Sequence, residues 1–383
     1  MEYRRLGRTE LQVSVIGVGG GYLMLLEREM ATQLYQRAYD LGVNYFDGRY
    51  GDSSAKLKPV IAQDREHCFV TSKTAESSAE GALRRIEEDL QYLDTDYIDI
   101  FFLRCYNHKM LEERFAPKGA LEGLCRAREQ GKIRHIGMAN HSDPSVLTRA
   151  IETDLVDVVL FPLNIIRREA LEALIPVTQK HDVGLAVMKP LSVGSIPAQI
   201  GLRWLNNQPI HTSVLGMSTL QQLEMDVEIV ERKPPALSVE ETSNVERCRQ
   251  KLNNYTCRIC DHLCRPVCEP GLPIDWMIYH DPFYEHYHKI GLEAFLEFPL
   301  APEVKNIVED HFARRLALAQ ACTRCGLCEK NCPFQLPIMG MIEEMKGNHA
   351  LLIEAVKKLA WSSRCDLADS SSYGGFFQSR KGK

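Results

Sequence analysis

Eight of the 13 cysteines are gathered in two short runs, and their spacing suits the binding of iron–sulfur clusters. The second run is Cys322-x2-Cys325-x2-Cys328-x3-Cys332, followed directly by a proline. Cysteines at these spacings bind a 4Fe–4S cubane, and in two-cluster ferredoxins the cysteine before the proline ligates the other cluster. A structural zinc site normally uses two separated Cys-x2-Cys pairs instead of a close-set run of four. The run therefore predicts a 4Fe–4S cluster.

The first run has one longer gap, but an internal repeat relates it to the second. It reads Cys257-x2-Cys260-x3-Cys264-x3-Cys268, and Leu-Pro-Ile follows its last cysteine at the same offset as in the second run. Two similar halves with four cysteines each predict a pseudo-symmetric module that holds two 4Fe–4S clusters. The other five cysteines are expected to be small buried hydrophobes: Cys68, Cys105, Cys125, Cys248 and Cys365.

A second set of reactive side chains lies at the ends of apolar runs that we predict to be strands. Asp47 ends the second of these apolar runs and Tyr50 follows it, and Lys73, Arg104 and Asn140 stand at the ends of the next three apolar runs. A tyrosine can protonate a carbonyl oxygen if its pKa falls, and a nearby ammonium lowers that pKa by favouring the phenolate. An aspartate can hold the lysine in place. The alternative is that these residues only cap the strands through ordinary salt bridges.

The elements that would position these side chains alternate between short apolar runs and stretches of helical period. The apolar runs are Ser14–Gly20, Asn44–Asp47, Cys68–Thr74, Ile98–Arg104, Arg134–Asn140, Val156–Asn164, Gly184–Leu191 and Thr212–Ser218. Eight strand–helix units over about 220 residues predict an α/β fold, a (β/α)8 TIM barrel, whose active site lies at the carboxyl ends of the strands. No Gly-x-Gly-x-x-Gly follows a strand, which argues against a Rossmann sheet. Ser218-x-x-Gln221 predicts a capping box at the last helix.

Length and composition set the domain organisation and exclude several classes of partner. The 383 residues predict a barrel over 1–235, a smaller all-helical iron–sulfur domain over 236–365, and a flexible Ser-, Gly- and Lys-rich tail over 366–383. Lys plus Arg number 46 and Asp plus Glu 51, a net charge of −5 that gives no support for a nucleic-acid partner. No membrane span and no secretory signal are recognisable, so we expect a cytoplasmic protein.

Four segments resemble aldo/keto reductases, and the similarity extends over about residues 1 to 232. They are Tyr3-Arg4-Arg5-Leu6-Gly7-Arg8-Thr9, Asn44-Tyr45-Phe46-Asp47 with Tyr50-Gly51-Asp52-Ser53, Thr71-Ser72-Lys73, and Gly131 to Asn140. The cysteine module resembles a ferredoxin-like C-terminal domain carried by a prokaryotic branch of that family. It is also similar to the helical domains of succinate-dehydrogenase-type iron–sulfur subunits. That pattern implies one cluster on Cys257, Cys260, Cys264 and Cys332, and another on Cys322, Cys325, Cys328 and Cys268.

The resemblance implies hydride transfer between a nicotinamide dinucleotide and a small carbonyl compound. It makes Asp47, Tyr50 and Lys73 catalytic, and it puts Arg104 where the family has a histidine. The implied cofactor-binding residues are Asn140, Gly216, Ser218, Thr219 and Gln222. Other departures are a shortened segment between Asp47 and Tyr50, and an alanine and a leucine at positions 139 and 160. Residues 216–226 contain no Lys or Arg to receive a 2′-phosphate, which favours NADH over NADPH.

Three functions remain open at this point. The first is an enzyme that reduces a small and, because of Arg104, acidic carbonyl compound, or runs the reverse reaction, with two 4Fe–4S clusters passing electrons to a redox partner protein. The second is an electron-transfer or assembly protein whose barrel has lost hydride chemistry. The third gives the clusters a structural or oxidant-sensing role. Binding of a dinucleotide would separate the first function from the second.

Overall fold

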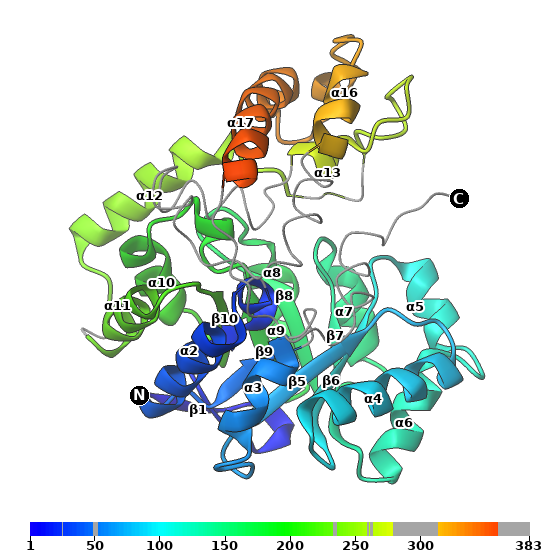
Figure 1. The fold of residues 1–383 in the computed structure, drawn as a ribbon. Helices are drawn as coiled ribbons and strands as arrows, with labels where there is room; N and C mark the ends of the chain where they lie inside the picture. The colour runs from blue at the N-terminus through cyan, green and yellow to red at the C-terminus, as the bar shows by residue number, and fades with distance from the viewer. Residues whose placement is uncertain are drawn as a thin grey trace. The chain divides into compact units, whose positions relative to one another are not determined.

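The chain divides into two compact units, and each is described here by itself. The computed structural model describes residues 1–24, 26–48, 53–232, 236–258, 260, 263–278 and 313–358. The first unit comprises Met1–Met24, Arg28–Leu191 and Pro197–Val245, and the second comprises Leu25–Glu27, Ser192–Ile196 and Glu246–Lys383 (Figure 1). Tyr50, the Pro-Pro boundary at 234–235 and the predicted tail over 366–383 lie outside the described residues.

The first unit is a closed barrel of eight parallel strands, as the sequence predicts. The strands are β3 (Ile16–Gly19), β4 (Tyr45–Asp47), β5 (Phe69–Thr74), β6 (Ile98–Arg104), β7 (Ile133–Ala139), β8 (Val158–Pro162), β9 (Gly184–Met188) and β10 (Thr212–Gly216). β10 pairs with both β9 and β3, which closes the barrel in the order β10-β3-β4-β5-β6-β7-β8-β9. Each strand overlaps one of the eight predicted apolar runs, so the carboxyl ends that carry the candidate residues share one rim.

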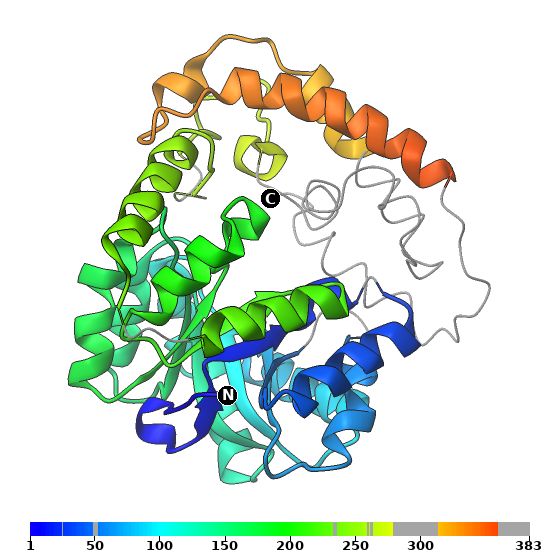
Figure 2. The same ribbon diagram turned by 90° about the vertical axis from the view of Figure 1, so that its left-hand side faces the viewer.

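Helices cover the outside of the barrel (Figure 1, Figure 2). They are α1 (Gly20–Leu23), α2 (Arg28–Asp40), α3 (Ser53–Ile61), α4 (Ala79–Leu93), α5 (His108–Phe115), α6 (Ala120–Glu129), α7 (Pro144–Ile151), α8 (Glu169–Ala173), α9 (Ile175–Lys180), α10 (Ala198–Asn206) and α11 (Leu220–Glu231). The next helix, α12 (Val239–Asn253), begins in the first unit and ends in the second. Their apolar faces are buried; α2, for example, buries Ala31, Leu34, Tyr35 and Ala38.

An N-terminal hairpin closes the end of the barrel that is opposite to the candidate residues. Strands β1 (Tyr3–Arg5) and β2 (Gln12–Ser14) pair antiparallel, and a short 3-10 turn lies between them at Gly7–Thr9. Leu6 packs so tightly on Gly184, the first residue of β9, that a Cβ there would lie 2.7 Å from the Leu6 Cγ. The hairpin therefore packs at the amino ends of the strands, and the carboxyl ends remain for the site.

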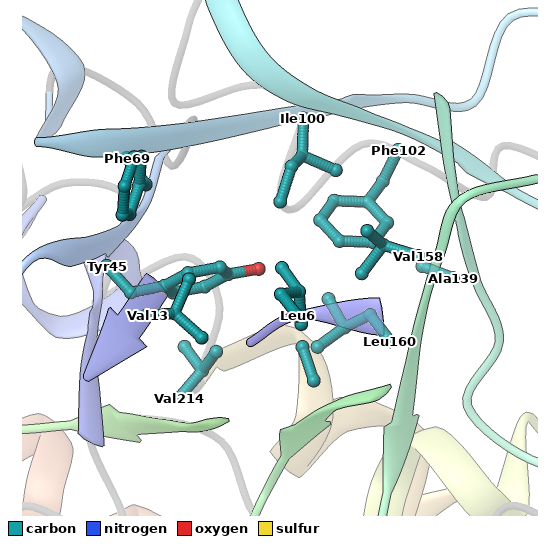
Figure 3. Close-up of a cluster of buried hydrophobic side chains, with 11 residues drawn as sticks. Leu6, Val13, Tyr45, Phe69, Ile100, Phe102, Ala139, Val158, Leu160 and Val214 are labelled. Carbon is teal, nitrogen blue, oxygen red and sulfur yellow. The ribbon is translucent and has the colours of Figure 1, made fainter. Parts of the chain in front are cut away.

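Buried apolar side chains fill the barrel interior (Figure 3). The cluster comprises Leu6, Val13, Tyr45, Phe69, Ile100, Phe102, Ala139, Val158, Leu160, Ala186 and Val214. The Phe102 ring occupies space that a side chain at Gly137 would need, since a Cβ there would lie 2.3 Å from the ring. Ala139 and Leu160, which stand where the resemblance leads one to expect polar residues, are 2% exposed and belong to this apolar cluster.

The second unit contains helices α13 (Ile274–Ile278), α16 (Leu327–Lys330) and α17 (Ile338–Lys358) around a small core of its own. The sequence repeat is also a structural repeat. Gly271 and Gln335 both have positive φ, and each donates its N–H to the carbonyl of the preceding cysteine, Cys268 or Cys332. Both Leu-Pro-Ile segments then lead into a helix that begins at the isoleucine.

The structure thus shows C-terminal helices, while their ferredoxin-like character stays a prediction. Within the part of the chain that the structure describes, no helix is long and apolar enough to cross a bilayer.

Candidate active site and cysteine sites

A buried ion pair joins two of the predicted catalytic residues. The Lys73 ammonium donates to both carboxylate oxygens of Asp47, at 2.8 and 2.7 Å, and the Thr71 hydroxyl donates to Oδ1 at 2.8 Å. β4 and β5 pair with Asp47 opposite Thr71, which brings these groups together at the rim. Both charged side chains are under 5% exposed, so their pairing must offset the cost of removing two charges from water. The aspartate holds the lysine, as the sequence predicts.

Arg104 ends β6 beside this pair, and it is half-buried. Among the described residues, no hydrogen bond or ion pair joins its guanidinium to another group, and Asp47 is bound to Lys73 and Thr71 instead. The structure therefore has no ion pair between Arg104 and Asp47, while the Asp47–Lys73 pair is also what the strand-capping alternative predicts. A guanidinium at the end of a barrel strand, with no carboxylate partner among the described residues, is suited to bind the carboxylate of a ligand.

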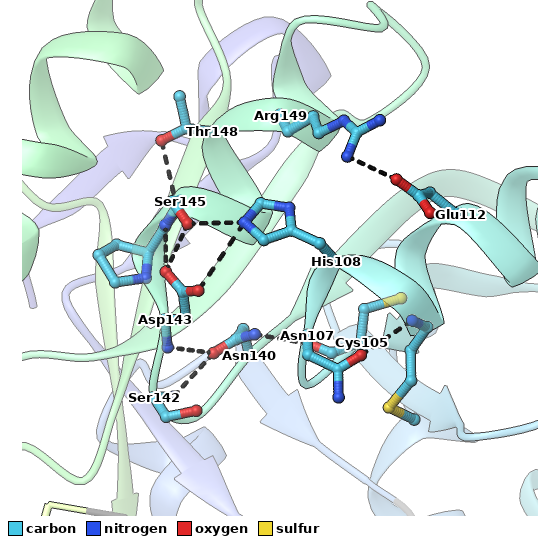
Figure 4. A network of polar contacts seen from close by, with 12 residues as sticks. Cys105, Asn107, His108, Glu112, Asn140, Ser142, Asp143, Ser145, Thr148 and Arg149 are labelled. Atoms are coloured by element: carbon cyan, nitrogen blue, oxygen red, sulfur yellow. Dashed lines mark hydrogen bonds and ion pairs between the residues drawn. The ribbon is translucent and has the colours of Figure 1, made fainter. Parts of the chain in front are cut away.

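Asn140 holds the turn that follows β7 (Figure 4). Its side chain is fully buried; Nδ2 donates to the Cys105 carbonyl at 2.6 Å, and Oδ1 accepts from the N–H groups of Ser142 and Asp143 at 2.7 and 2.8 Å. An asparagine amide has two N–H donors and one carbonyl oxygen with two lone pairs. The amide is thus used mainly within the chain, and the predicted role in binding a nicotinamide carboxamide stays a prediction.

The other four predicted dinucleotide-binding residues, Gly216, Ser218, Thr219 and Gln222, lie together where β10 leads into α11. Thr219 caps the helix by accepting from the Gln222 N–H at 3.1 Å, so the cap that the sequence predicts at Ser218 lies one residue later. Gln222 Oε1 in turn accepts from the Ser218 N–H at 2.9 Å. The Tyr22 ring packs over Gly216, where a Cβ would lie 2.5 Å from the ring. The Ser218 N–H is thus already bonded within the chain, one residue before the N-cap of the helix whose first turn could receive a phosphate.

Three further polar residues at this rim escaped the sequence reasoning. Lys189, which follows β9, has its Nζ 3.4 Å from Nδ1 of His141, which follows β7. Arg167, after β8, donates to the His141 carbonyl at 2.8 Å. They follow strand ends just as the predicted residues do, and that position is the signal that could have found them.

Positive charge dominates the surroundings of His141. Removal from water lowers the pKa of His141 well below its usual value, and the charges of Lys189, Arg104, Lys73 and Arg167 lower it further. Because these cations come from β5, β6 and the segments after β8 and β9, the rim as a whole favours a neutral imidazole and an anionic ligand.

In the second unit, one cavity brings together cysteines from both runs. It is lined by Cys257, Cys260, Cys264 and Cys332, mostly among apolar side chains of the same unit. Burial raises the pKa of Cys264 to about 11, and burial together with the nearby Cys332 raises that of Cys260. These four cysteines are the set that the resemblance assigns to one cluster, and the apolar lining suits a group bound by thiolates.

The four cysteines assigned to the second cluster are less closely assembled. Cys268 and Cys322 pack against the core to which the buried Cys328 belongs, while Cys325 is exposed. N–H and hydroxyl donors from Leu327 and Thr323 lower the pKa of Cys325. Among the described residues, no three His, Cys, Asp or Glu side chains converge closely enough to hold a single metal ion. Cluster binding by either set therefore stays a prediction.

Comparison with known proteins supports the barrel assignment. The model of the aldo/keto reductase family matches residues 15–197. L-galactose dehydrogenase of Arabidopsis thaliana is 25% identical over 311 residues, which cover 67% of this chain and 97% of that protein. An aldo-keto reductase of Mycobacterium avium is 28% identical over 217 residues, covering 51% and 73%. The holo form of the aldo-keto reductase AKR11C1 from Bacillus halodurans has the same fold, with a TM-score of 0.55 at 19% identity over 65% of this chain and 96% of its own.

Fold and matches together define a (β/α)8 barrel oxidoreductase. The chain is an aldo/keto reductase-like oxidoreductase, and both cysteine runs lie outside the residues that the family model matches.

Proposed function

We propose that this protein reduces a small carbonyl compound that carries a carboxylate, or oxidises the corresponding hydroxy acid. The observation that carries the proposal is the Arg104 guanidinium, which has no partner among the described residues and ends the strand next to the Asp47–Lys73 pair. In this proposal Arg104 binds the carboxylate and Lys73, oriented by Asp47, lowers the pKa of the proton donor. That donor is Tyr50, as the family resemblance implies.

We further propose that electrons pass between the barrel and a redox partner protein through two 4Fe–4S clusters. Cys257, Cys260, Cys264 and Cys332 would hold the first, and their common apolar cavity supports this assignment. Cys322, Cys325, Cys328 and Cys268 would hold the second, by analogy with the repeated turns of the two halves. Each cluster would carry one electron when bound, so the two together would supply the electron pair that reduction of one carbonyl group needs, with two protons taken up alongside. The reducing cytoplasm would keep these thiols available for iron.

The dinucleotide is proposed with a preference for NADH over NADPH, because residues 216–226 hold no cation for a 2′-phosphate. At the phosphate end Gln222 is bonded to the Ser218 N–H and Tyr22 covers Gly216, so both side chains would have to move before a phosphate binds there. We therefore derive no step through the dinucleotide.

A second candidate is an electron-transfer or assembly protein with a barrel that no longer transfers hydride. The apolar Ala139 and Leu160 inside the barrel core favour it.

One experiment separates the two functions. Anaerobically purified protein is offered 2-oxo acids and their neutral amides, with NADH or with a chemically reduced one-electron carrier as reductant. Reduction of the acids at least roughly tenfold faster than of the amides supports the enzyme, because the loss of a charged contact typically costs a few kcal/mol. Absence of both carbonyl reduction and dinucleotide binding would favour the second candidate.

A further inference from the structure

His141 occupies an unusual position at the rim of the barrel. It directly follows Asn140, is mostly buried, and packs edge-on to the Tyr106 ring with the ring centroids 6.0 Å apart. Removal from water has the largest effect on its pKa, and four cations add to it: Lys189 after β9, Arg104 from β6, Lys73 from β5, which is paired with Asp47, and Arg167 after β8. All four are cations, so a proton that made the imidazole positive would be repelled from each side.

The contact with Lys189 also indicates which nitrogen of a neutral His141 ring carries the proton. An ammonium can only donate hydrogen bonds, so the ring nitrogen that faces it must accept. Lys189 Nζ lies 3.4 Å from Nδ1 of His141, which leaves the proton on Nε2. A neutral imidazole in this tautomer has a single N–H donor. A cation cannot accept a hydrogen bond from it, but an oxygen of a ligand can.

The backbone holds Lys189 in place for this contact. Its φ is +57°, a conformation that residues other than glycine adopt uncommonly. The Asn164 amide donates to the Lys189 carbonyl at 2.9 Å, and Asn164 Oδ1 accepts from the N–H groups of Ile166 and Arg167. One buried asparagine therefore positions the two residues, Lys189 and Arg167, that contact His141.

We propose that His141 is a ligand-binding residue of the barrel site, kept neutral with its proton on Nε2 by Lys189, and that this pair together with Arg104 selects a small 2-oxo carboxylate. The Nε2–H donates to an oxygen of the ligand, while Lys189 and Arg104 attract its carboxylate. The proposal rests on the proposed acid-substrate function and names the residues that would give the site its selectivity.

The tautomer can be measured without any reaction. We suggest 15N NMR of the histidine rings in the anaerobic, oxidised holoprotein, followed between about pH 5.5 and 8. The His141 signals should show a neutral ring protonated on Nε2 over this whole range. In Lys189→Gly, which suits the positive φ, the His141 pKa should rise and the preference for Nε2 should weaken. An imidazolium near neutral pH, or a proton on Nδ1, would overturn the proposal.

Binding of pyruvate, with neutral pyruvamide as its matched comparison, tests the selectivity. Pyruvate should bind more tightly than pyruvamide, and Lys189→Gly should weaken pyruvate about tenfold while leaving pyruvamide nearly unchanged. Lys180→Gly, at an exposed position at the end of α9, is the control and should change neither affinity. Equal affinities for the two compounds, or tighter binding of inorganic phosphate than of pyruvate, would overturn the 2-oxo carboxylate assignment.

Failure of the His141–Lys189 proposal and failure of the proposed function give different experimental results. If Lys189→Gly binds pyruvate normally while Arg104→Met does not, the His141–Lys189 proposal falls and the acid-substrate function stands. If the tautomer and the effect of Lys189→Gly are as expected but no 2-oxo acid is reduced, the pair stands as an anion site and the proposed reaction falls.

Discussion

The Lys73 ammonium bonds to both carboxylate oxygens of Asp47, and this pairing separates the aspartate from Arg104. The rim therefore contains a buried Asp–Lys ion pair with no net charge, next to an arginine for which the described residues supply no partner. If Arg104 had instead taken the aspartate, Lys73 would be the residue left to face a ligand, and the site would favour a different chemistry.

Asp47→Asn should destabilise the barrel strongly. Removing one partner of a buried ion pair leaves an uncompensated charge, which costs about 3–5 kcal/mol. Chemical denaturation should show a correspondingly lower free energy of unfolding. Asp94→Asn is the matched control, because Asp94 pairs with Lys58 at the surface and asparagine tolerates its positive φ. The control should cost at most about 1 kcal/mol; equal losses in the two variants would contradict the buried pairing.

Arg104→His should change substrate preference more than stability. The substitution removes a guanidinium that binds carboxylates bidentately and restores the residue that the family resemblance leads one to expect. We expect acid substrates to lose at least roughly tenfold in kcat/KM, and neutral aldehydes to gain relative to them. The ratio of kcat/KM for a 2-oxo acid and its amide is the measurement. A less stable variant with the same ratio would show that Arg104 is structural.

The anaerobic protein should be brown and contain about eight irons per chain, from two four-iron clusters. The cavity shared by Cys332 and three cysteines of the first run also predicts which cluster each substitution damages. Cys332→Ser should impair the cluster of the first run, and Cys268→Ser that of the second, as seen by EPR of the reduced protein. About one zinc and no sulfide would refute the clusters, and loss confined to the run that carries each substitution would refute the crossing.

Much of the barrel could be predicted because buried parallel strands leave a clear pattern of short apolar runs. Ile98–Arg104, for example, was predicted with its observed bounds. The cap at α11 was predicted one residue early, because Ser218 and Thr219 are both good capping residues and only the path of the backbone decides between them.

The contacts at the rim were harder to predict. Lys189 and His141 are far apart in the sequence, and single Lys and His residues after strands usually face water. Only closure of the barrel brings them together. By contrast, Asp47 and Lys73 belong to neighbouring strands, so their contact follows once the strand order is known.

One buried carboxyl should contribute less to stability as the pH rises. Burial raises the pKa of Asp89 to about 8, and the Ser72 hydroxyl donates to it at 2.5 Å. Between its unfolded pKa near 4 and about 8, the folded state binds more protons than the unfolded state, so this group's contribution is full at low pH and is lost as the pH rises. The difference in unfolding midpoint between the original protein and a variant that cannot titrate at position 89 should therefore grow across this range.

Asp89→Asn keeps an acceptor for Ser72 and removes the titration. The variant should be more stable than the original protein at about pH 8.5, and the two should be similar at about pH 5. Asp99→Asn is the contrasting variant, because Asp99 pairs with Arg65 and Arg134 and its loss should destabilise at both pH values. An unchanged pH dependence in Asp89→Asn would assign it to other groups.

Gln222→Ala should strengthen dinucleotide binding. In the described conformation the Gln222 side chain accepts from the Ser218 N–H, and that bond must break before a phosphate can use the same donor. A net hydrogen bond is worth about 1 kcal/mol, so the Kd for NADH should fall about fivefold. Gln221→Ala, at the adjacent position, is the control, because no hydrogen bond of its side chain to the described residues would be lost.

Titration calorimetry with NADH and NADPH measures the Kd of each variant for each dinucleotide. NADH should remain the tighter ligand in both variants, since residues 216–226 contain no cation. A tighter Kd for NADPH would mean that a basic group from elsewhere reaches the 2′-phosphate. If neither dinucleotide binds even to Gln222→Ala, the barrel does not use a nicotinamide, and the electron-transfer function becomes the better account.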